Sequence, residues 1–147
     1  MSSASSMKLR FVTPEKTIFS EREIKEIVLP TESGEITVLP NHAALVSLIS
    51  AGIVQIIPAS PNGAKDNKEY FSVAGGFIEI ANNQVAILAE NAETTEEVDP
   101  KRAEEAIAQA KKKLAEDKNI DHLKLELQLQ KNVARLKLAK FSKKAFK

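Results

Sequence analysis

The sequence contains two histidines, and neither has the neighbours that histidine chemistry needs. His42 follows a Pro-Asn turn between two apolar runs, in the stretch ITVLPNHAALVSLISAG. His122 lies in a different part of the chain, and no HExxH motif or carboxylate cluster accompanies either residue. We therefore expect no metal site at either residue, and we interpret His42 as part of a loop whose shape matters.

Other patterns that support catalysis are also missing. The chain has no cysteine, no GxSxG elbow and no glycine-rich phosphate loop. Gly75 and Gly76 stand alone inside a strand pattern, which indicates a bulge or a close backbone approach. The adjacent acids Glu96 and Glu97 fall in a polar stretch where solvation is the default. We predict a protein that is not an enzyme and has no resident cofactor.

Composition predicts a soluble chain with a core and two oppositely charged parts. Of 147 residues, 43% are hydrophobic and 28% are charged. Residues 1–97 carry 7 basic and 13 acidic side chains, a net −6, whereas residues 98–147 carry 14 basic and 7 acidic, a net +7. Such a change suggests two parts with different partners, or two parts that attract each other. Residues 1–6 do not resemble a signal peptide, and we expect a disordered leader or an alternative start.

Residues 7–92 have the pattern of short β-strands. Nine segments of five to seven residues are rich in Val, Ile and Phe, and Pro, Gly and Asn turns separate them. The segment EIKEIVL and the longer stretch GFIEIANNQVAIL, which spans two segments, alternate between polar and apolar residues. This spacing predicts an antiparallel β-sandwich or a flattened barrel, followed by a linker at 93–98.

Residues 99–141 have the pattern of two helices. Asp99 is a candidate N-cap with Pro100 at the first helical position, and apolar residues follow at helical spacing. The segment HLKLELQLQ alternates with period two, but its residues favour helix, so we predict a second helix over about 122–140. Two apolar stripes and a polar, mostly basic face follow from 100° per residue. The first stripe is Leu123, Leu127, Ala134 and Leu138; the second is Leu125, Leu129, Val133 and Leu136. The chain would end in a basic tail at 142–147.

The basic C-terminal part raises the question of nucleic acid or membrane binding. Lysines in KLAKFSKKAFK could neutralise phosphates. Interleaved acids and few aromatic residues argue against nucleic acid, and the low apolar content argues against a membrane-surface helix. We expect neither partner.

Three stretches carry a resemblance to a known family. SGEITVLPNHAALVSLISAG, FSVAGGFIEIANNQVAILAENAE and VDPKRAEEA resemble, in order and spacing, the epsilon subunit of F-type ATP synthases of bacteria and chloroplasts, which corresponds to the mitochondrial delta subunit. The resemblance covers residues 7 to about 140. One departure is Asn41, where the family usually has glycine, and asparagine also tolerates a left-handed backbone.

Membership in this family implies a fold and a role. The fold is a β + α arrangement, an antiparallel β-sandwich of about ten strands followed by an antiparallel two-helix hairpin. The role is that of a non-catalytic central-rotor subunit, which links the gamma subunit to the membrane c ring in proton-driven ATP synthesis. The hairpin would be able to inhibit ATP hydrolysis. The location implied is the cytoplasmic face of a bacterial inner membrane, or the stromal or matrix face in an organelle, with membrane association only through the complex.

The resemblance also implies contact residues. The turn at Glu32, Ser33, Gly34 and Glu35, together with His42, would contact the c ring; alternatively, Gly34 only makes the turn and His42 only pins its loop. The basic hairpin would meet the beta and alpha subunits of the catalytic head, or its cations only solvate the surface. The candidate head contacts are Lys111, Lys112, Lys113, Lys124, Lys131 and Arg135.

Some relatives bind ATP between the two helices as a regulatory ligand. The positions that match their pattern here are Glu93, Asp99, Arg102, Lys131 and Arg135. One family arginine falls on Gln109 and another on Lys131, and lysine cannot copy bidentate phosphate contacts. We therefore predict weak ATP binding or none. The alternative to the whole interpretation is a free-standing sandwich–hairpin adaptor that binds an acidic protein or nucleic acid.

Overall fold

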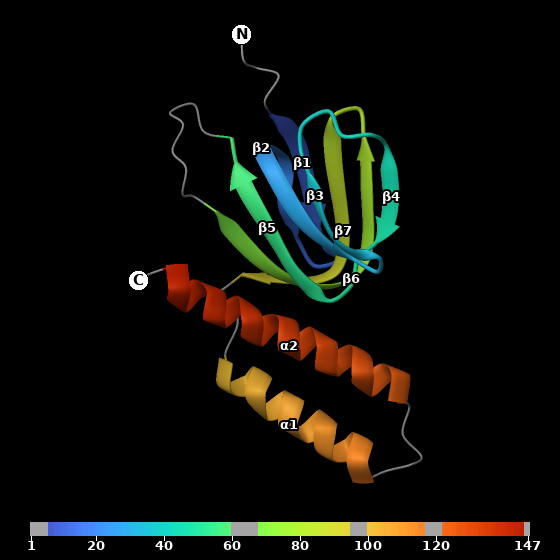
Figure 1. Ribbon diagram of the computed structural model, residues 1–147, viewed down its shortest axis with the longest axis vertical. Coiled ribbons are helices and arrows are strands. Elements are labelled where there is room, and N and C mark those ends of the chain that lie inside the picture. The colour runs from blue at the N-terminus through green and yellow to red at the C-terminus, as the bar shows by residue number, and fades with distance from the viewer. Residues whose placement is uncertain (1–5, 60–67, 95–99, 117–121, 146–147) are drawn as a thin grey trace.

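The computed structural model describes residues 6–59, 68–94, 100–116 and 122–145, with side chains described up to residue 140. Within these residues seven strands precede two helices (Figure 1). The strands are β1 (Met7–Val12), β2 (Thr17–Thr31), β3 (Gly34–Val38), β4 (Leu45–Leu48), β5 (Gly52–Pro58), β6 (Glu69–Ala81) and β7 (Gln84–Thr94). The helices are α1 (Pro100–Glu116) and α2 (His122–Ala145). The predicted β-sandwich followed by a two-helix hairpin is confirmed.

Five strands close into a ring, which makes the sandwich a flattened barrel. The order is β1, β7, β6, β5 and β2, and β2 pairs again with β1. β3 extends the ring at β2, and β4 pairs with β6. All pairings are antiparallel except that of β1 with β7, which is parallel. A closed ring has no free edge strand, and its backbone hydrogen bonds resist shear.

Two long strands pass from one layer of the sandwich to the other. β2 pairs with β1 along its first half and with β5 and β3 along its second half. β6 pairs with β5 through Val73 and with β4 from Phe77 onward. Each long strand joins two segments that the sequence predicted separately, so the described strands are fewer and longer than the nine segments.

Gly75 and Gly76 occupy the point where β6 changes partner. Both have positive φ, 76° and 118°. A Cβ on Gly76 would lie 2.0 Å from the carbonyl oxygen of Leu88. The β6–β7 register is unchanged across this point, from Ala74 opposite Asn91 to Gly76 opposite Ala89. Of the two predicted alternatives, the close backbone approach is therefore the one that the structure contains.

The core lies between the layers, and alternate residues of β1 and of most of β7 point into it. Burial is continuous over residues 29–31 of β2 and 71–73 of β6. Leu9, Phe11, Ile78 and Ile87 are fully buried in it. The ring of Phe71 packs against that of Phe11 at a centroid distance of 5.3 Å. This period-two burial is the alternation that the sequence predicted.

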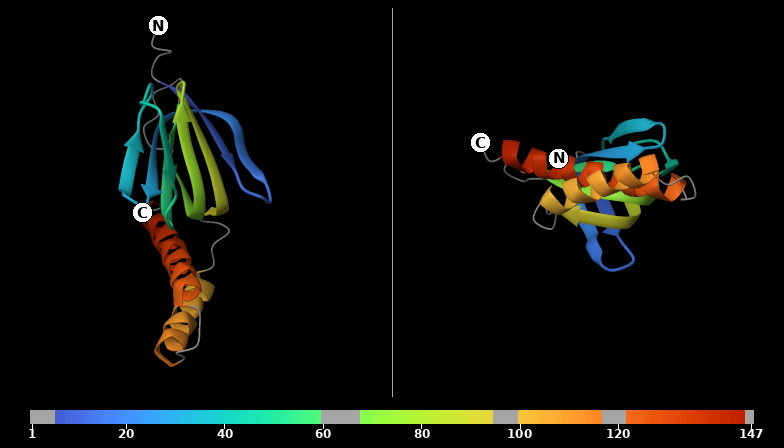
Figure 2. Two further views of the ribbon diagram at one scale, coloured as in Figure 1. Left: turned by 90° about the vertical axis from the view of Figure 1, so that its right-hand side faces the viewer. Right: turned by 90° about the horizontal axis from the view of Figure 1, so that it is seen from below.

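The hairpin lies against one side of the sandwich, and only one of its helices makes the main contact. α2 packs on β5 and β6, while α1 packs on α2 (Figures 1 and 2). Ala103 and Ala110 are the buried residues of α1. HLKLELQLQ is helical, as predicted, and α1 begins at Pro100.

Element ends differ slightly from the predicted boundaries. β7 continues to Thr94, two residues past the expected end of the sandwich at 92. α2 continues to Ala145, past the expected end of the hairpin at 141, because Ser, Lys and Ala in that stretch are compatible with helix. Residues 1–5 of the expected leader, the linker residues 95–98, Asp99 and residues 146–147 lie outside the described residues. No helix among the described residues is both long and apolar enough to cross a membrane.

Candidate functional site

The junction between hairpin and sandwich brings together two of the predicted ATP-binding residues. Arg135 Nε, on α2, donates a hydrogen bond to Glu93 Oε2, on β7, at 2.6 Å. Only 23% of the Arg135 side chain and 19% of that of Glu93 are exposed, so water and salt screen this pair less than a surface pair. Arg102 is exposed on α1, and Lys131 is half-buried on α2. Asp99 lies outside the described residues.

An apolar contact lies beside this ion pair. Leu138 is fully buried and Ala139 is 8% exposed, and both pack with the partly buried side chains of Ile53 and Tyr70. Leu138 belongs to the first predicted stripe of α2, so the C-terminal half of that stripe docks on the sandwich. Leu123 and Leu127, in its N-terminal half, are 67% and 57% exposed. The contact of α2 with the sandwich is therefore narrow. It involves the C-terminal half of the stripe, while the N-terminal half leaves apolar side chains exposed.

A cleft opens between the sandwich and the exposed half of α2. It encloses about 830 Å³. Glu32 and Glu90 line it from the sandwich, and Lys124 and Lys131 line it from α2. The oppositely charged parts that the composition predicted thus meet across this cleft and at the Glu93–Arg135 pair.

The residues predicted to contact the c ring fall into two separate groups. Glu32 and Ser33 form the turn between β2 and β3, where Thr31 Oγ1 donates to Gly34 O at 2.5 Å. His42 lies beyond the other end of β3, where Asn41 N donates to Asn83 Oδ1 at 2.8 Å. All four turn residues, Glu32 to Glu35, are exposed, and His42 is half-buried. The two groups therefore lie at opposite ends of β3.

The His42 loop is held in place by a chain of hydrogen bonds. Asn41 has φ 65°, the left-handed conformation that we expected asparagine to tolerate in place of glycine. Asn83 Nδ2 donates to the carbonyl of Ser6 at 3.0 Å, which ties the loop to the start of β1. His42 Nδ1 lies 2.7 Å from Ala43 O and closes the loop locally. The interpretation of His42 as a loop-shaping residue stays a prediction.

An apolar patch on the outer face of the sandwich is a surface that the sequence reasoning did not single out. Leu48, Phe77 and Leu88 lie directly opposite one another across β4, β6 and β7. They are 43%, 56% and 48% exposed, and Val46 on the same face is 72% exposed. We call these four residues the outer apolar patch. Exposed apolar groups that gather in this way are typical of protein interfaces. The signal was present in GFIEIANNQVAIL, where Phe77 and Leu88 fall on the polar side of the alternation.

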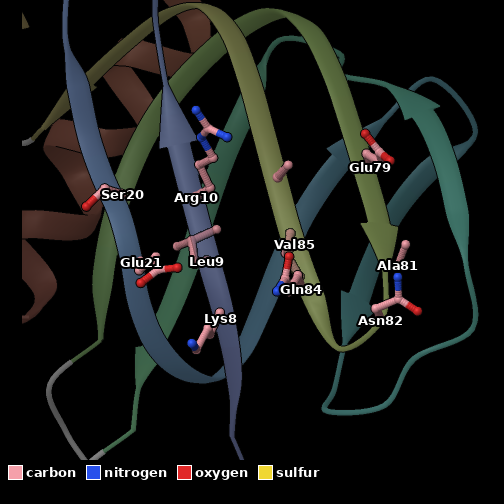
Figure 3. A pocket seen from close by; sticks show the side chains of 11 residues that line it. Lys8, Leu9, Arg10, Ser20, Glu21, Glu79, Ala81, Asn82, Gln84 and Val85 are labelled. Atoms are coloured by element: carbon pink, nitrogen blue, oxygen red, sulfur yellow. The ribbon is translucent and has the colours of Figure 1, made fainter.

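Another hollow lies on the outer face of β1, β2, β6 and β7 (Figure 3). It encloses about 520 Å³ and carries charges of both signs, with Lys8 and Arg10 beside Glu21 and Glu79. It contains none of the predicted site residues. The remaining predicted head contacts, Lys111, Lys112 and Lys113, are exposed on α1.

Among the described residues no three His, Asp or Glu side chains gather in a way that could hold a metal ion. The described residues offer the outer apolar patch, the Glu32–Glu35 turn, the His42 loop and a basic hairpin joined to the closed sandwich by few contacts. These features are typical of a small two-part protein that binds other proteins.

Comparison with known proteins identifies the family. Residues 6–95 match the family described as ATP synthase, Delta/Epsilon chain, beta-sandwich domain, and residues 96–140 match its long alpha-helix domain. The ATP synthase epsilon chain of Desulfitobacterium hafniense (strain Y51) is 40% identical over 137 residues, which cover 93% of this chain and 98% of that protein. The chloroplastic epsilon chain of Pelargonium hortorum is 40% identical over 116 residues, 76% of this chain and 81% of that one. The chain belongs to the delta/epsilon family of F-type ATP synthase subunits, as its motifs predicted.

Solved structures with the same fold come from two mitochondrial ATP synthases. A chain in the structure of OSCP, F1 and c-ring of the Euglena gracilis mitochondrial ATP synthase superposes with a TM-score of 0.76 at 22% identity. The match covers 86% of this chain and 76% of that one. A chain in the central stalk and c-ring structure of the Tetrahymena thermophila enzyme gives 0.55 at 15% identity, over 92% and 95% of the two chains. At these identities the likeness concerns the fold.

Proposed function

We propose that this chain is a non-catalytic central-rotor subunit of an F-type ATP synthase, which connects the gamma subunit to the c ring during proton-driven ATP synthesis. The observation that carries the proposal is the family match, which extends over both the sandwich and the hairpin. In this role the chain binds gamma, the c ring and the alpha and beta subunits of the head. It sits on the cytoplasmic face of a bacterial inner membrane, or on the stromal or matrix face in an organelle, and is held there only by the complex.

The outer apolar patch supports the gamma contact. A rotor joint transmits torque, so the surface that binds gamma must be apolar enough for stable association and rigid enough not to deform. The patch lies on β4, β6 and β7, and β6 and β7 belong to the closed ring. Phenylalanine is enriched at protein interfaces, and burial of Phe77 together with Leu88 removes apolar surface from water, which favours association.

The exposed turn Glu32–Glu35 and the His42 loop are the two candidate c-ring contacts. Because they lie at opposite ends of β3, the two alternatives give separate results in cross-linking of complexes with a cysteine at position 35 or position 42.

The hairpin supports a second role, inhibition of ATP hydrolysis. Its docked contact is narrow, and Leu123 and Leu127 are 67% and 57% exposed in the docked state. A helix pair with such a balance can exchange one set of contacts for another of similar free energy. The exposed lysines of α1 would then meet acidic surfaces of the head.

Truncation of the chain after Glu97 tests the inhibitory role. The catalytic head is reconstituted with gamma and either the full chain or the truncated chain, and ATP hydrolysis is measured. We expect faster hydrolysis with the truncated chain, since the hairpin is absent while the sandwich and its outer patch remain. Equal rates would show that the hairpin does not inhibit hydrolysis. Loss of gamma binding by both forms would contradict the rotor role itself.

A further inference from the structure

Three polar side chains form a connected network between α2 and the sandwich. Arg135 Nε donates to Glu93 Oε2 at 2.6 Å, and Arg135 Nη1 donates to Asn132 Oδ1 at 3.2 Å. Asn132 Nδ2 in turn donates to the carbonyl of Gln128 at 2.9 Å. The guanidinium is therefore positioned by its own helix before it reaches the carboxylate, which lowers the entropic cost of forming the pair.

The two charged residues belong to different rigid parts of the protein. Glu93 lies near the end of β7 and faces Ser72 in the β6–β7 ladder, so its backbone is held by the closed ring. Arg135 lies on α2, 42 positions later in the chain. The bond between them is consequently broken whenever the hairpin leaves the sandwich.

Other groups around Glu93 contribute a mixed charge environment. Glu15, Lys16 and Glu90 line a small hollow together with Glu93. Glu15 and Glu90 add negative charge around this hollow, and Lys16 adds a positive charge. A cation fixed on α2 is the complement that this surface attracts.

We propose that the Glu93–Arg135 pair is a latch that holds the hairpin against the sandwich without any nucleotide. This regulatory proposal rests on the proposed function, because the pair regulates activity only if the undocked hairpin binds the catalytic head. The latch and the Leu138 contact together hold the docked state. Breaking the pair shifts the hairpin toward the open state while the folded sandwich is unaffected.

The latch changes what ATP is expected to do. Glu93 and Arg135 are two of the residues that match the nucleotide-binding pattern, and here they are bonded to each other. A phosphate group that approached Arg135 would have to displace the Glu93 carboxylate. ATP therefore does not tighten the docked state of this chain.

Fluorescence energy transfer within the isolated full chain measures the docked population. The chain has no cysteine, so dyes can be attached at Ser20→Cys on β2 and Lys113→Cys on α1, both exposed. We expect Arg135→Gln to raise the ratio of open to docked chains about fivefold, as for a moderately strong ion pair. Glu93→Gln should have the same effect, and the double variant should open no further than either single variant. The charge-swapped variant, Glu93→Arg with Arg135→Glu, should recover part of the docked population.

Lys137→Gln is the matched control, because it removes one positive charge from an exposed position on the same turn of α2. Thermal unfolding of the sandwich confirms that each variant is folded. The latch is overturned if Lys137→Gln opens the hairpin as much as Arg135→Gln, or if the two single effects add in the double variant. It is also overturned if millimolar ATP raises energy transfer in the unmodified chain but not in Arg135→Gln.

These results are separate from those that test the proposed function. Energy transfer reports docking in the isolated chain, whereas the truncation experiment reports hydrolysis by the reconstituted head. A failed latch would leave the inhibitory role intact, and a failed inhibitory role would leave the latch measurable.

Discussion

Replacement of Leu138 by alanine tests how narrowly the hairpin is docked. Leu138 is fully buried at the contact with Ile53 and Tyr70. Replacement of a buried leucine by alanine lowers stability by about 2–5 kcal/mol. The lower end applies where neighbouring side chains can fill the space that the leucine leaves. This contact lies at the boundary between the hairpin and the sandwich and involves few residues. We therefore expect Leu138→Ala to weaken docking of the hairpin by about 2 kcal/mol. This corresponds to a roughly 30-fold rise in the ratio of open to docked chains.

The loss should be confined to the hairpin. The main core of the sandwich is a separate cluster that includes Leu9, Phe11 and Ile78 and does not include Leu138. Amide hydrogen exchange should therefore accelerate along α2, where helices of this length depend on packing for stability. Exchange in β1, β6 and β7 should stay slow, and the unfolding midpoint of the sandwich should stay unchanged.

Leu123→Ala is the control, because Leu123 lies on the same stripe of α2 but is 67% exposed. It should change exchange in α2 far less than Leu138→Ala does. The reasoning is refuted if both variants accelerate exchange equally, or if Leu138→Ala lowers the unfolding free energy of the sandwich as much as that of docking.

Two other predictions concern the sandwich. Gly76→Ala should destabilise it by at least about 3 kcal/mol, since the new Cβ meets a backbone oxygen at φ 118°. Gly34→Ala, at φ 116° with open space around it, isolates backbone strain and should cost about 1–2 kcal/mol in the same denaturant titration; equal losses would contradict the close-approach explanation. Phe77→Ser should leave the unfolding midpoint nearly unchanged, because the ring is 56% exposed, yet weaken gamma binding at least tenfold in a pull-down titration. Unchanged gamma binding would exclude the outer apolar patch as the gamma surface.

Sequence reasoning succeeded where the signal is local. Proline at position 100 marks the start of α1, since its fixed φ and missing N–H suit a helix N-terminus. Asn41 adopts the left-handed backbone that its side chain tolerates. The alternation in β6 and β7 gives the buried face of the sandwich, and helix propensity correctly decided HLKLELQLQ.

Strand number and loop placement depended on pairing across the chain. The segments KTIFS and EIKEIVL form one strand, β2, because β1 pairs with its first half and β5 with its second half. The residues that decide this continuity lie in β1 and β5, outside both segments of β2. Likewise, Glu35 and His42 are close in sequence, but Glu35 lies at the start of β3 and His42 lies beyond its other end, so the strand keeps them apart.

The sequence by itself determined the class of fold, the charge difference between the two parts, the family and the absence of recognisable catalytic motifs. These follow from periodicity, turn chemistry and composition, which act over a few neighbouring residues. Only the tertiary structure decided that Glu93 meets Arg135, that Leu138 docks while Leu127 stays exposed, and that Leu48, Phe77 and Leu88 form one patch. Each of these depends on the register in which distant strands pair or on the side of the sandwich against which α2 packs. The free energy of these long-range contacts depends on the whole folded chain, so no short stretch of residues reveals it.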